Sequence, residues 1–309
     1  KGRALSVTNN TCAVTVTASG STELRGNGGE NNAVYACGSD ANASFTLILQ
    51  DNAKLISVKD GISFEHGGSP IKKATIALLD YASVQTGSDC TFMKASTNVA
   101  ERAITYIRSD RATVTTKTEL GSAGKFGKTT VYTPAMKKGA SVRIVEGSNG
   151  LRFTSTLANG AAPTRYGTLI VKAADLGSTE FTIAALTAAN ITFANIEATE
   201  AGTVAGATET TYNAALTNLP EDQLTTDFAA RAYAVYTVDG VEYIVYSDFV
   251  VGADGKSDNI RNISDVAEAA HNDTKTEQTD EYCHEVAEGV WSPYTKEQYD
   301  LLLTFVKKK

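Results

Sequence analysis

The sequence predicts a mainly β protein built from two β-sandwich-like domains, the second of which also carries one or two packed helices. Three observations support this fold class. Short runs rich in β-branched residues follow one another closely in the N-terminal half, with Gly- and Asn-rich turns between them. Two long apolar runs flank an Asp-Gly dipeptide in the second half. Two segments near the C-terminus instead repeat apolar residues at the spacing of a helix.

The first domain is expected to span residues 1–140. The polar turn at 59–61 predicts a hairpin between its flanking strands, and another short turn at 109–111 separates the next two strand candidates. A Gly-rich stretch at 121–127 and the tripeptide at 137–139 predict a linker, which places the boundary near residue 140. The strand candidates are short apolar or alternating runs at residues 4–7, 13–18, 43–50, 54–58, 62–65, 73–81, 90–94, 103–108, 112–118 and 129–133.

The second domain, residues 141–309, is expected to be organised around a hairpin at residues 228–251. The central Asp239-Gly240 accepts the positive φ angles of a type I′ turn, and a two-residue loop fixes the register of the strands. This register places Tyr233 directly opposite Tyr246. One face of the hairpin is nearly all apolar and is predicted to be core, whereas the other mixes charged, aromatic and apolar residues.

Two helices are predicted after the hairpin. Residues 262–271 show a helical apolar face, and Asn262 or Ser264 can cap its first turn. Thr295-Lys-Glu-Gln298 is a capping box, and the apolar spacing that follows predicts a final helix to Lys308.

The composition indicates a globular chain: 42% of its 309 residues are hydrophobic and 20% are charged. The net charge of −7 provides no basic excess for phosphates, so nucleic acid is not an expected partner. No run of 18 apolar residues occurs, so no membrane span is expected in this chain. Because the chain begins with Lys1 rather than Met, we expect a processed or truncated product from which a signal peptide could have been removed.

Four cysteines permit three pairings, and each pairing joins Cys283 to the N-terminal half. Cys12 and Cys37 flank a Gly/Asn loop and are the easiest pair to close, which leaves Cys90 with Cys283. For an exported chain we expect this disulfide-bonded state. The alternative is that the cysteines are reduced and buried as small hydrophobic residues.

The candidate ligand-binding residues lie on the second face of the hairpin and comprise Arg231, Tyr233, Tyr246 and Asp248. If open, this face could stack a sugar on its aromatic rings and bind hydroxyls through its charges. The alternative is that the final helix or another sheet covers the tyrosines. A second, weaker candidate is a calcium site at Asp254 and Asp258, whose carboxylates lie in a Gly-containing loop; a plain turn is the alternative. No cofactor is expected.

Catalysis is not expected either. The chain has three histidines, His66, His271 and His284, and no G-x-S-x-G nucleophile motif accompanies them. Five N-x-Ser/Thr triplets could accept glycans in a eukaryotic or archaeal secreted protein, or could arise by chance, and they begin at Asn9, Asn42, Asn190, Asn262 and Asn272.

About half of the chain, from Gly150 to the helix near His271, resembles a β-rich accessory domain of large secreted surface proteins of Gram-positive anaerobic bacteria. The resemblance is carried by the motifs GLRF (150–153), YGTLI (166–170), TNLP (217–220), FAARAY (228–233) and NISDVA (262–267). Such domains occur in adhesins and in glycan-degrading systems, and no catalytic residues are attached to them. The resemblance and the composition together predict a secreted, extracellular or cell-surface structural protein or adhesin, such as a subunit of a filament or surface layer. Its expected partners are copies of itself or other surface proteins. The alternative is a carbohydrate-binding accessory module, with a glycan as the partner.

Overall fold

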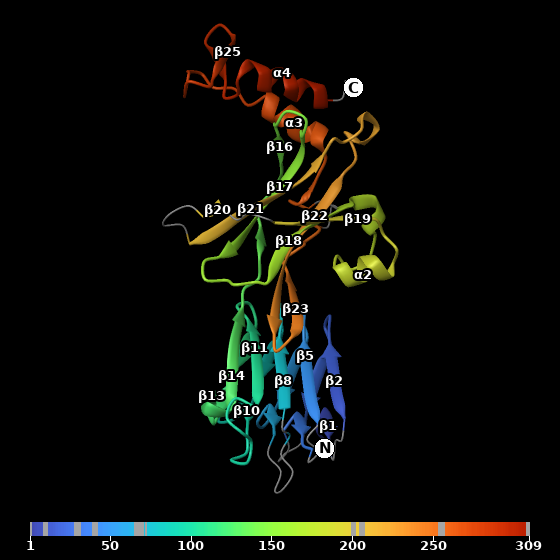
Figure 1. Ribbon diagram of the computed structural model, residues 1–309, viewed down its shortest axis with the longest axis vertical. Coiled ribbons are helices and arrows are strands. Elements are labelled where there is room, and N and C mark those ends of the chain that lie inside the picture. Colours follow the sequence, from blue (N-terminus) through green and yellow to red (C-terminus); the bar gives the residue numbers. More distant parts are fainter. Residues whose placement is uncertain are drawn as a thin grey trace. The chain divides into compact units, whose positions relative to one another are not determined.

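The computed structural model describes residues 2–8, 12–27, 32–38, 43–64, 71, 73–198, 202–203, 208–252 and 257–306 (Figure 1). The chain divides into two compact units, Lys1–Thr133 and Pro134–Lys309, close to the predicted boundary. The predicted mainly β class is confirmed, with 45% of residues in strands and 13% in helices. Among the helices described, none is long and apolar enough to cross a membrane.

Unit 1 is a β-solenoid, so the prediction of two sandwich-like domains is wrong. Its strands form three parallel sheets, and each coil contributes one strand to each wall except the last, which contributes β13 and β14 only (Figure 1). The first sheet comprises β1 (Leu5–Val7), β4 (Val34–Ala36), β7 (Ile62–Ser63), β10 (Thr91–Lys94) and β13 (Thr118–Gly121). The second comprises β2 (Ala13–Ala18), β5 (Ser44–Leu49), β8 (Lys73–Leu78), β11 (Ile104–Ser109) and β14 (Phe126–Val131). The third comprises β3 (Glu23–Gly26), β6 (Lys54–Ser57), β9 (Ser83–Gln85) and β12 (Thr113–Thr115), and the 3₁₀ helix η1 (Ala123–Lys125) precedes β14.

The hairpin predicted at 59–61 and the short turn predicted at 109–111 are both corners of the solenoid. The turn at 59–61 joins β6 to β7, and the turn at 109–111 joins β11 to β12, but in both cases the two strands belong to different sheets. A corner and a hairpin turn use the same polar residues, and an inward-facing solenoid strand alternates like a sandwich strand. The local pattern therefore did not distinguish the two folds.

A repeated corner sets the length of the coil. The pentapeptides starting at Asp51, Asp80 and Asp110 all read Asp-x-Ala-x-Leu/Val. The amide of Gly20 donates to Asp51 Oδ2 at 2.9 Å, and the amide of Thr133 donates to Asp110 Oδ1 at 2.9 Å. These carboxylates therefore tie their corners to a neighbouring coil, the preceding one for Asp51 and the following one for Asp110. The alanine of each pentapeptide is buried, because the corner packs closely against a core that includes Phe45, Leu47, Leu49, Leu55, Ile62, Ile76 and Phe92.

Unit 2 contains two antiparallel sheets that share a core. One sheet contains β15 (Ala135–Met136), β16 (Ser141–Arg143), β17 (Gly150–Ala158), β20 (Gly202–Thr203) and β21 (Glu209–Thr217). The other contains β18 (Arg165–Lys172), β19 (Phe193–Glu197), β22 (Phe228–Val238), β23 (Val241–Tyr246) and β24 (Ile260–Arg261). A small third sheet pairs β25 (His284–Ala287) with β26 (Val290–Ser292). The helical segments are α1 (Ala173–Leu176), α2 (Ile183–Ala188), η2 (Glu221–Gln223), α3 (Ile263–His271) and α4 (Lys296–Phe305).

The predicted hairpin is confirmed as β22 and β23, but β23 ends at Tyr246, so residues 247–251 lie outside the strand that was predicted to include them. Asp239 and Gly240 have φ angles of 52° and 77°, and Tyr233 lies opposite Tyr246 in the register. The two predicted helices are confirmed as α3, capped by Asn262, and α4, which begins with the predicted capping box. Helix α4 ends at Phe305 rather than at Lys308.

Candidate functional site

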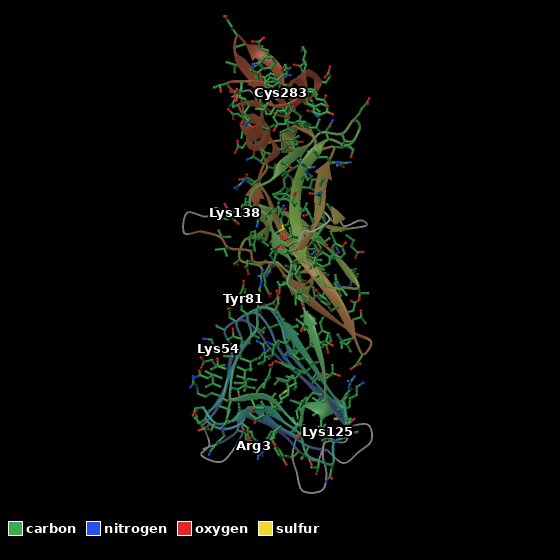
Figure 2. All side chains as sticks on the ribbon, turned by 90° about the vertical axis from the view of Figure 1, so that its left-hand side faces the viewer. Arg3, Lys54, Tyr81, Lys125, Lys138 and Cys283 are labelled. Carbon is green, nitrogen blue, oxygen red and sulfur yellow. The ribbon has the colours of Figure 1, made fainter. Side chains whose placement is uncertain are left out.

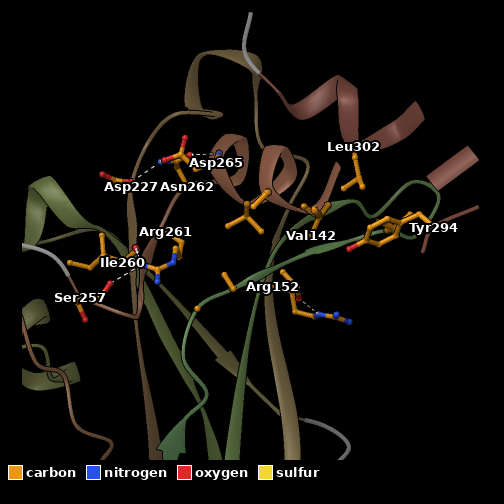
Figure 3. Close-up of a pocket in the computed structure, with 17 residues that line it drawn as sticks. Val142, Arg152, Asp227, Ser257, Ile260, Arg261, Asn262, Asp265, Tyr294 and Leu302 are labelled. Atoms are coloured by element: carbon orange, nitrogen blue, oxygen red, sulfur yellow. Dashed lines mark hydrogen bonds between the residues drawn. The ribbon is translucent and has the colours of Figure 1, made fainter. Parts of the chain in front are cut away.

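The best candidate site is a pocket of about 700 Å³ in unit 2, between β16, β17, β24, α3 and α4 (Figure 3). This volume falls in the range of pockets that hold small organic ligands. Its polar side chains come from several strands and from the start of α3, and its apolar wall comes from β16 and the two helices.

The start of α3 provides two fixed carboxylates. Asn262 is the N-cap, and its Oδ1 accepts a hydrogen bond from the Asp265 amide at 2.8 Å. The same side chain donates from Nδ2 to Asp227 Oδ1 at 2.9 Å and to Asp265 Oδ2 at 3.0 Å. Asn262 therefore holds both acids on one side of the pocket, as Figure 3 shows. A glycan on this Asn262 amide would disrupt these bonds.

Two arginines contribute positive charge. Arg261 of β24 donates from Nη1 to the carbonyl oxygens of Ser257 at 2.9 Å and Ile260 at 2.7 Å, which orders the chain before the strand. Arg152 of β17 donates from Nε to Ser141 Oγ at 2.9 Å. This bond uses only one edge of its guanidinium, so the terminal nitrogens remain able to bind an acceptor.

The opposite wall is apolar and ends at a phenol. Val142, Val266 and Leu302 line the pocket, and Leu302 is fully buried. Tyr294 follows β26, and Nδ1 of His284 lies 2.7 Å from its carbonyl oxygen, which fixes this segment. Burial, and then the negative charge of Asp273, raise the pKa of the Tyr294 phenol above its ordinary value. The hydroxyl is therefore protonated at neutral pH and can donate a hydrogen bond to a ligand.

This arrangement suits binding of a polar organic molecule with an apolar face. Carboxylate acceptors, guanidinium donors and a phenol surround an aliphatic wall. The residues that line the pocket include no Cys or His.

The predicted sugar platform on the hairpin is covered. Tyr233 is 0% exposed, and its hydroxyl donates to Asn195 Oδ1 at 2.7 Å. The Tyr246 hydroxyl accepts a hydrogen bond from the Ile183 amide at 3.2 Å, at the start of α2. The segment that contains α1 and α2 packs on both rings, in place of the final helix or second sheet that the sequence suggested. A sugar therefore has no access to Tyr233.

The other two residues of that candidate group, Arg231 and Asp248, differ in exposure, since Arg231 is partly buried and Asp248 is exposed. Arg231 donates from Nε to Ser247 O at 2.7 Å and from Nη1 to Phe181 O at 2.9 Å, so it ties the α1–α2 segment to the hairpin. Its guanidinium carbon lies 4.9 Å from the centre of the Tyr246 ring. Arg231 also lines a second pocket of about 510 Å³ beside Phe181 and Phe249.

Of the two carboxylates predicted to bind calcium, the structure describes only that of Asp258. Asp254 lies outside the described residues, as does His66. Asp258 forms an ion pair with Lys138 at 3.0 Å, and Arg261 Nη2 lies 3.9 Å from its other oxygen. Two cations thus already neutralise this carboxylate. Over the described ranges of the chain, no group of three or more His, Cys, Asp and Glu side chains could hold a metal.

The predicted disulfides are absent from the structure, where none of the four cysteines is joined to another. Cys12 precedes β2 and is exposed, whereas Cys37 follows β4 in another sheet and is buried. The loop that separates them was expected to bring them together, but it instead contains β3 and spans two corners of the solenoid. Cys283 lies in unit 2 near β25 (Figure 2), and its sulfur is 3.1 Å from Thr279 Oγ1.

Sequence reasoning missed Arg152, Asp227 and Tyr294. They lie on three segments far apart in the chain. Arg152 falls within the GLRF motif, and Asn262 and Asp265 fall within NISDVA, but no binding role was predicted for these motifs. Asn262 was predicted only as a helix cap. No protein-family model, curated protein or solved structure matches the chain.

Proposed function

We propose that this chain is a secreted cell-surface structural protein or adhesin without catalytic activity. The solenoid of unit 1 is the observation that carries the proposal. Its parallel sheets form a continuous hydrogen-bonded stack in which each added coil lengthens the unit by about 4.8 Å. Such a stack can act as a spacer, because every coil is hydrogen-bonded and packed to the next.

Unit 2 supplies the binding part of this proposal. Its pocket offers charged and phenolic groups beside an apolar wall, which suits attachment to a ligand better than chemistry upon one. The same pocket favours the second candidate function, a carbohydrate-binding accessory module. In that case sugar hydroxyls would bind Asp227, Asp265 and Arg152, and the nonpolar face of the ring would pack on Val142 and Val266.

Antibodies raised against the purified chain test the proposed location. On intact cells of the source they should label the surface, and immunogold electron microscopy should place them on a filament or outer layer. Labelling only after lysis would refute the proposal. A glycan array with wild type and Asp227→Ala tests whether the pocket binds a glycan: a specific sugar signal that this substitution removes would support the glycan-binding module, and the absence of any signal for wild type would refute it.

A further inference from the structure

We propose that the N-terminal end of the solenoid pairs with the same end of a second copy of this chain, through the edge strands β1, β2 and β3. This proposal rests on the proposed structural role and names the partner that such a role needs. In the described part of the chain, each of these strands is the last in its sheet, and β2 forms the margin of unit 1 at the right in Figure 1.

The two ends of the solenoid differ in their chemistry. At the C-terminal end, Glu119 of β13 closes the interior, with Oε1 2.6 Å from the Tyr106 hydroxyl and 2.9 Å from Arg108 Nη1. Lys128 of the edge strand β14 lies 3.4 Å from Oε2 of the same carboxylate. Charged groups of this kind cap a stack and discourage further pairing.

The N-terminal end has an apolar interior instead. Five aliphatic side chains project from its edge strands into the core and remain partly exposed, namely Leu5, Val7, Val14, Val16 and Leu24. Their counterparts one coil further in are fully buried; Phe45 and Leu47, which lie beside Val14 and Val16, are 0% exposed. One more layer on this end would bury the outer five in the same way.

The edge strand β2 is suited to pairing. Its sequence, Ala-Val-Thr-Val-Thr-Ala, contains no charge and no proline, the two devices that usually protect an edge. The backbone amides of Ser44 and Gln50 donate to the carbonyl oxygens of Cys12 and Ala18, so the backbone N–H and C=O groups of the even-numbered residues point toward β5. Backbone groups of Thr15 and its odd-numbered neighbours therefore face the open edge and can accept a new strand.

A second copy fits this edge through a two-fold axis at Thr15. Antiparallel pairing of β2 with its copy places Thr15 opposite the same residue of the second chain and Val14 opposite Val16 on the inward face. The same two-fold axis brings the β1 wall of one copy onto the β3 wall of the other. Strand β1 of each copy therefore lies beside β3 of the other copy. Because a coil climbs one strand spacing over three walls, all three junctions then have the same spacing.

Stacking of one copy's N-terminal end on the other's C-terminal end is less favourable. It would bury Arg108, Glu119 and Lys128 and remove these charges from water. The two-fold arrangement buries only backbone groups and aliphatic side chains at the centre. It is also closed, so the expected product is a dimer rather than an open fibre.

Sedimentation equilibrium of the full chain over a range of concentrations tests this inference. Wild type should form a dimer. Thr15→Lys should raise the dissociation constant at least tenfold, because like charges would lie directly opposite at the axis. Thr130→Lys, at an exposed position of the other edge strand, is the matched control and should leave the constant unchanged. Circular dichroism of each variant checks folding.

Hydrogen exchange provides an independent readout. The amides of Ala13, Thr15 and Thr17 should become protected as the wild-type concentration rises. A wild type that stays monomeric, or a dimer that Thr15→Lys and Thr130→Lys weaken equally, would overturn the pairing. If surface labelling of cells persists in that case, the proposed function stands without the dimer; a dimer without labelling would refute the function alone.

Discussion

The carboxylate of Glu119 is expected to stabilise the C-terminal end of the solenoid. It accepts hydrogen bonds from Tyr106 and Arg108 and forms an ion pair with Lys128, and its own side chain is 27% exposed. Truncation by Glu119→Ala would leave a fully buried tyrosine hydroxyl and a half-buried guanidinium without this acceptor. We expect a loss of about 2–4 kcal/mol in the free energy of unfolding of unit 1.

The pH dependence follows from the same contacts. Burial raises the pKa of Glu119, but the hydrogen bond from Tyr106 and the charge of Arg108 outweigh it, so the pKa lies below its ordinary value. A carboxyl group with a lowered folded pKa stabilises the protein fully above its unfolded pKa of about 4.3. This stabilisation is lost as the pH falls through the lower, folded value. Glu119→Gln keeps an acceptor for Tyr106, should cost about 1–2 kcal/mol at neutral pH, and should remove this part of the pH dependence.

Native-state hydrogen exchange of peptides from β11, β13 and β14 measures these effects within unit 1, since two units need not unfold in one transition. The matched control is Asp89→Ala, which removes an exposed 3.1 Å ion pair with Lys117 in the same unit and should cost no more than about 0.5 kcal/mol. If Glu119→Ala lowers the free energy of unfolding as little as this control does, the Glu119 carboxylate does not stabilise the C-terminal end of the solenoid as argued.

The other predictions concern unit 2 and the thiols. Gly167→Ala should destabilise unit 2 by about 2–4 kcal/mol, because a Cβ there would clash with the backbone carbonyl of Ile196; a melting curve within about 1 °C of wild type would contradict this. Asn262→Ala should cost about 1–2 kcal/mol through loss of the helix cap, read from the fluorescence of Trp291, and an unchanged urea midpoint would refute that role. Titration of the denatured, unreduced chain with a thiol reagent should count four thiols, whereas a count of two or none would show disulfides.

The features predicted correctly from the sequence are those with local causes. The Asp239-Gly240 turn requires positive φ at both positions, and that requirement fixed the register of the hairpin. The caps at Asn262 and Thr295 satisfy amides within their own first turn. Each signal lies within a few residues of the structure that it determines.

The solenoid was missed because parallel pairing joins residues a whole coil apart. Lys54 pairs with Ser83 and Ser83 with Thr113, so the coil length appears in the sequence only as a separation of about thirty residues between pairs. The one repeated signal is the pentapeptide that starts at Asp51, Asp80 and Asp110. A comparison of the N-terminal half with itself at this spacing would have revealed it.

The pocket could not be assembled from the sequence for a related reason. Arg152, Asp227 and Asn262 meet because β17, the start of β22 and the start of α3 converge in space, and no local pattern encodes that convergence. For Tyr233 the local structure was predicted correctly, but its accessibility to a ligand was not. That accessibility depended on whether the segment of α1 and α2 would fold back over the sheet. Register places a side chain on a face, but only tertiary packing decides whether that face can bind a ligand, so in this chain the search for a ligand moves from the hairpin to the pocket beside α3.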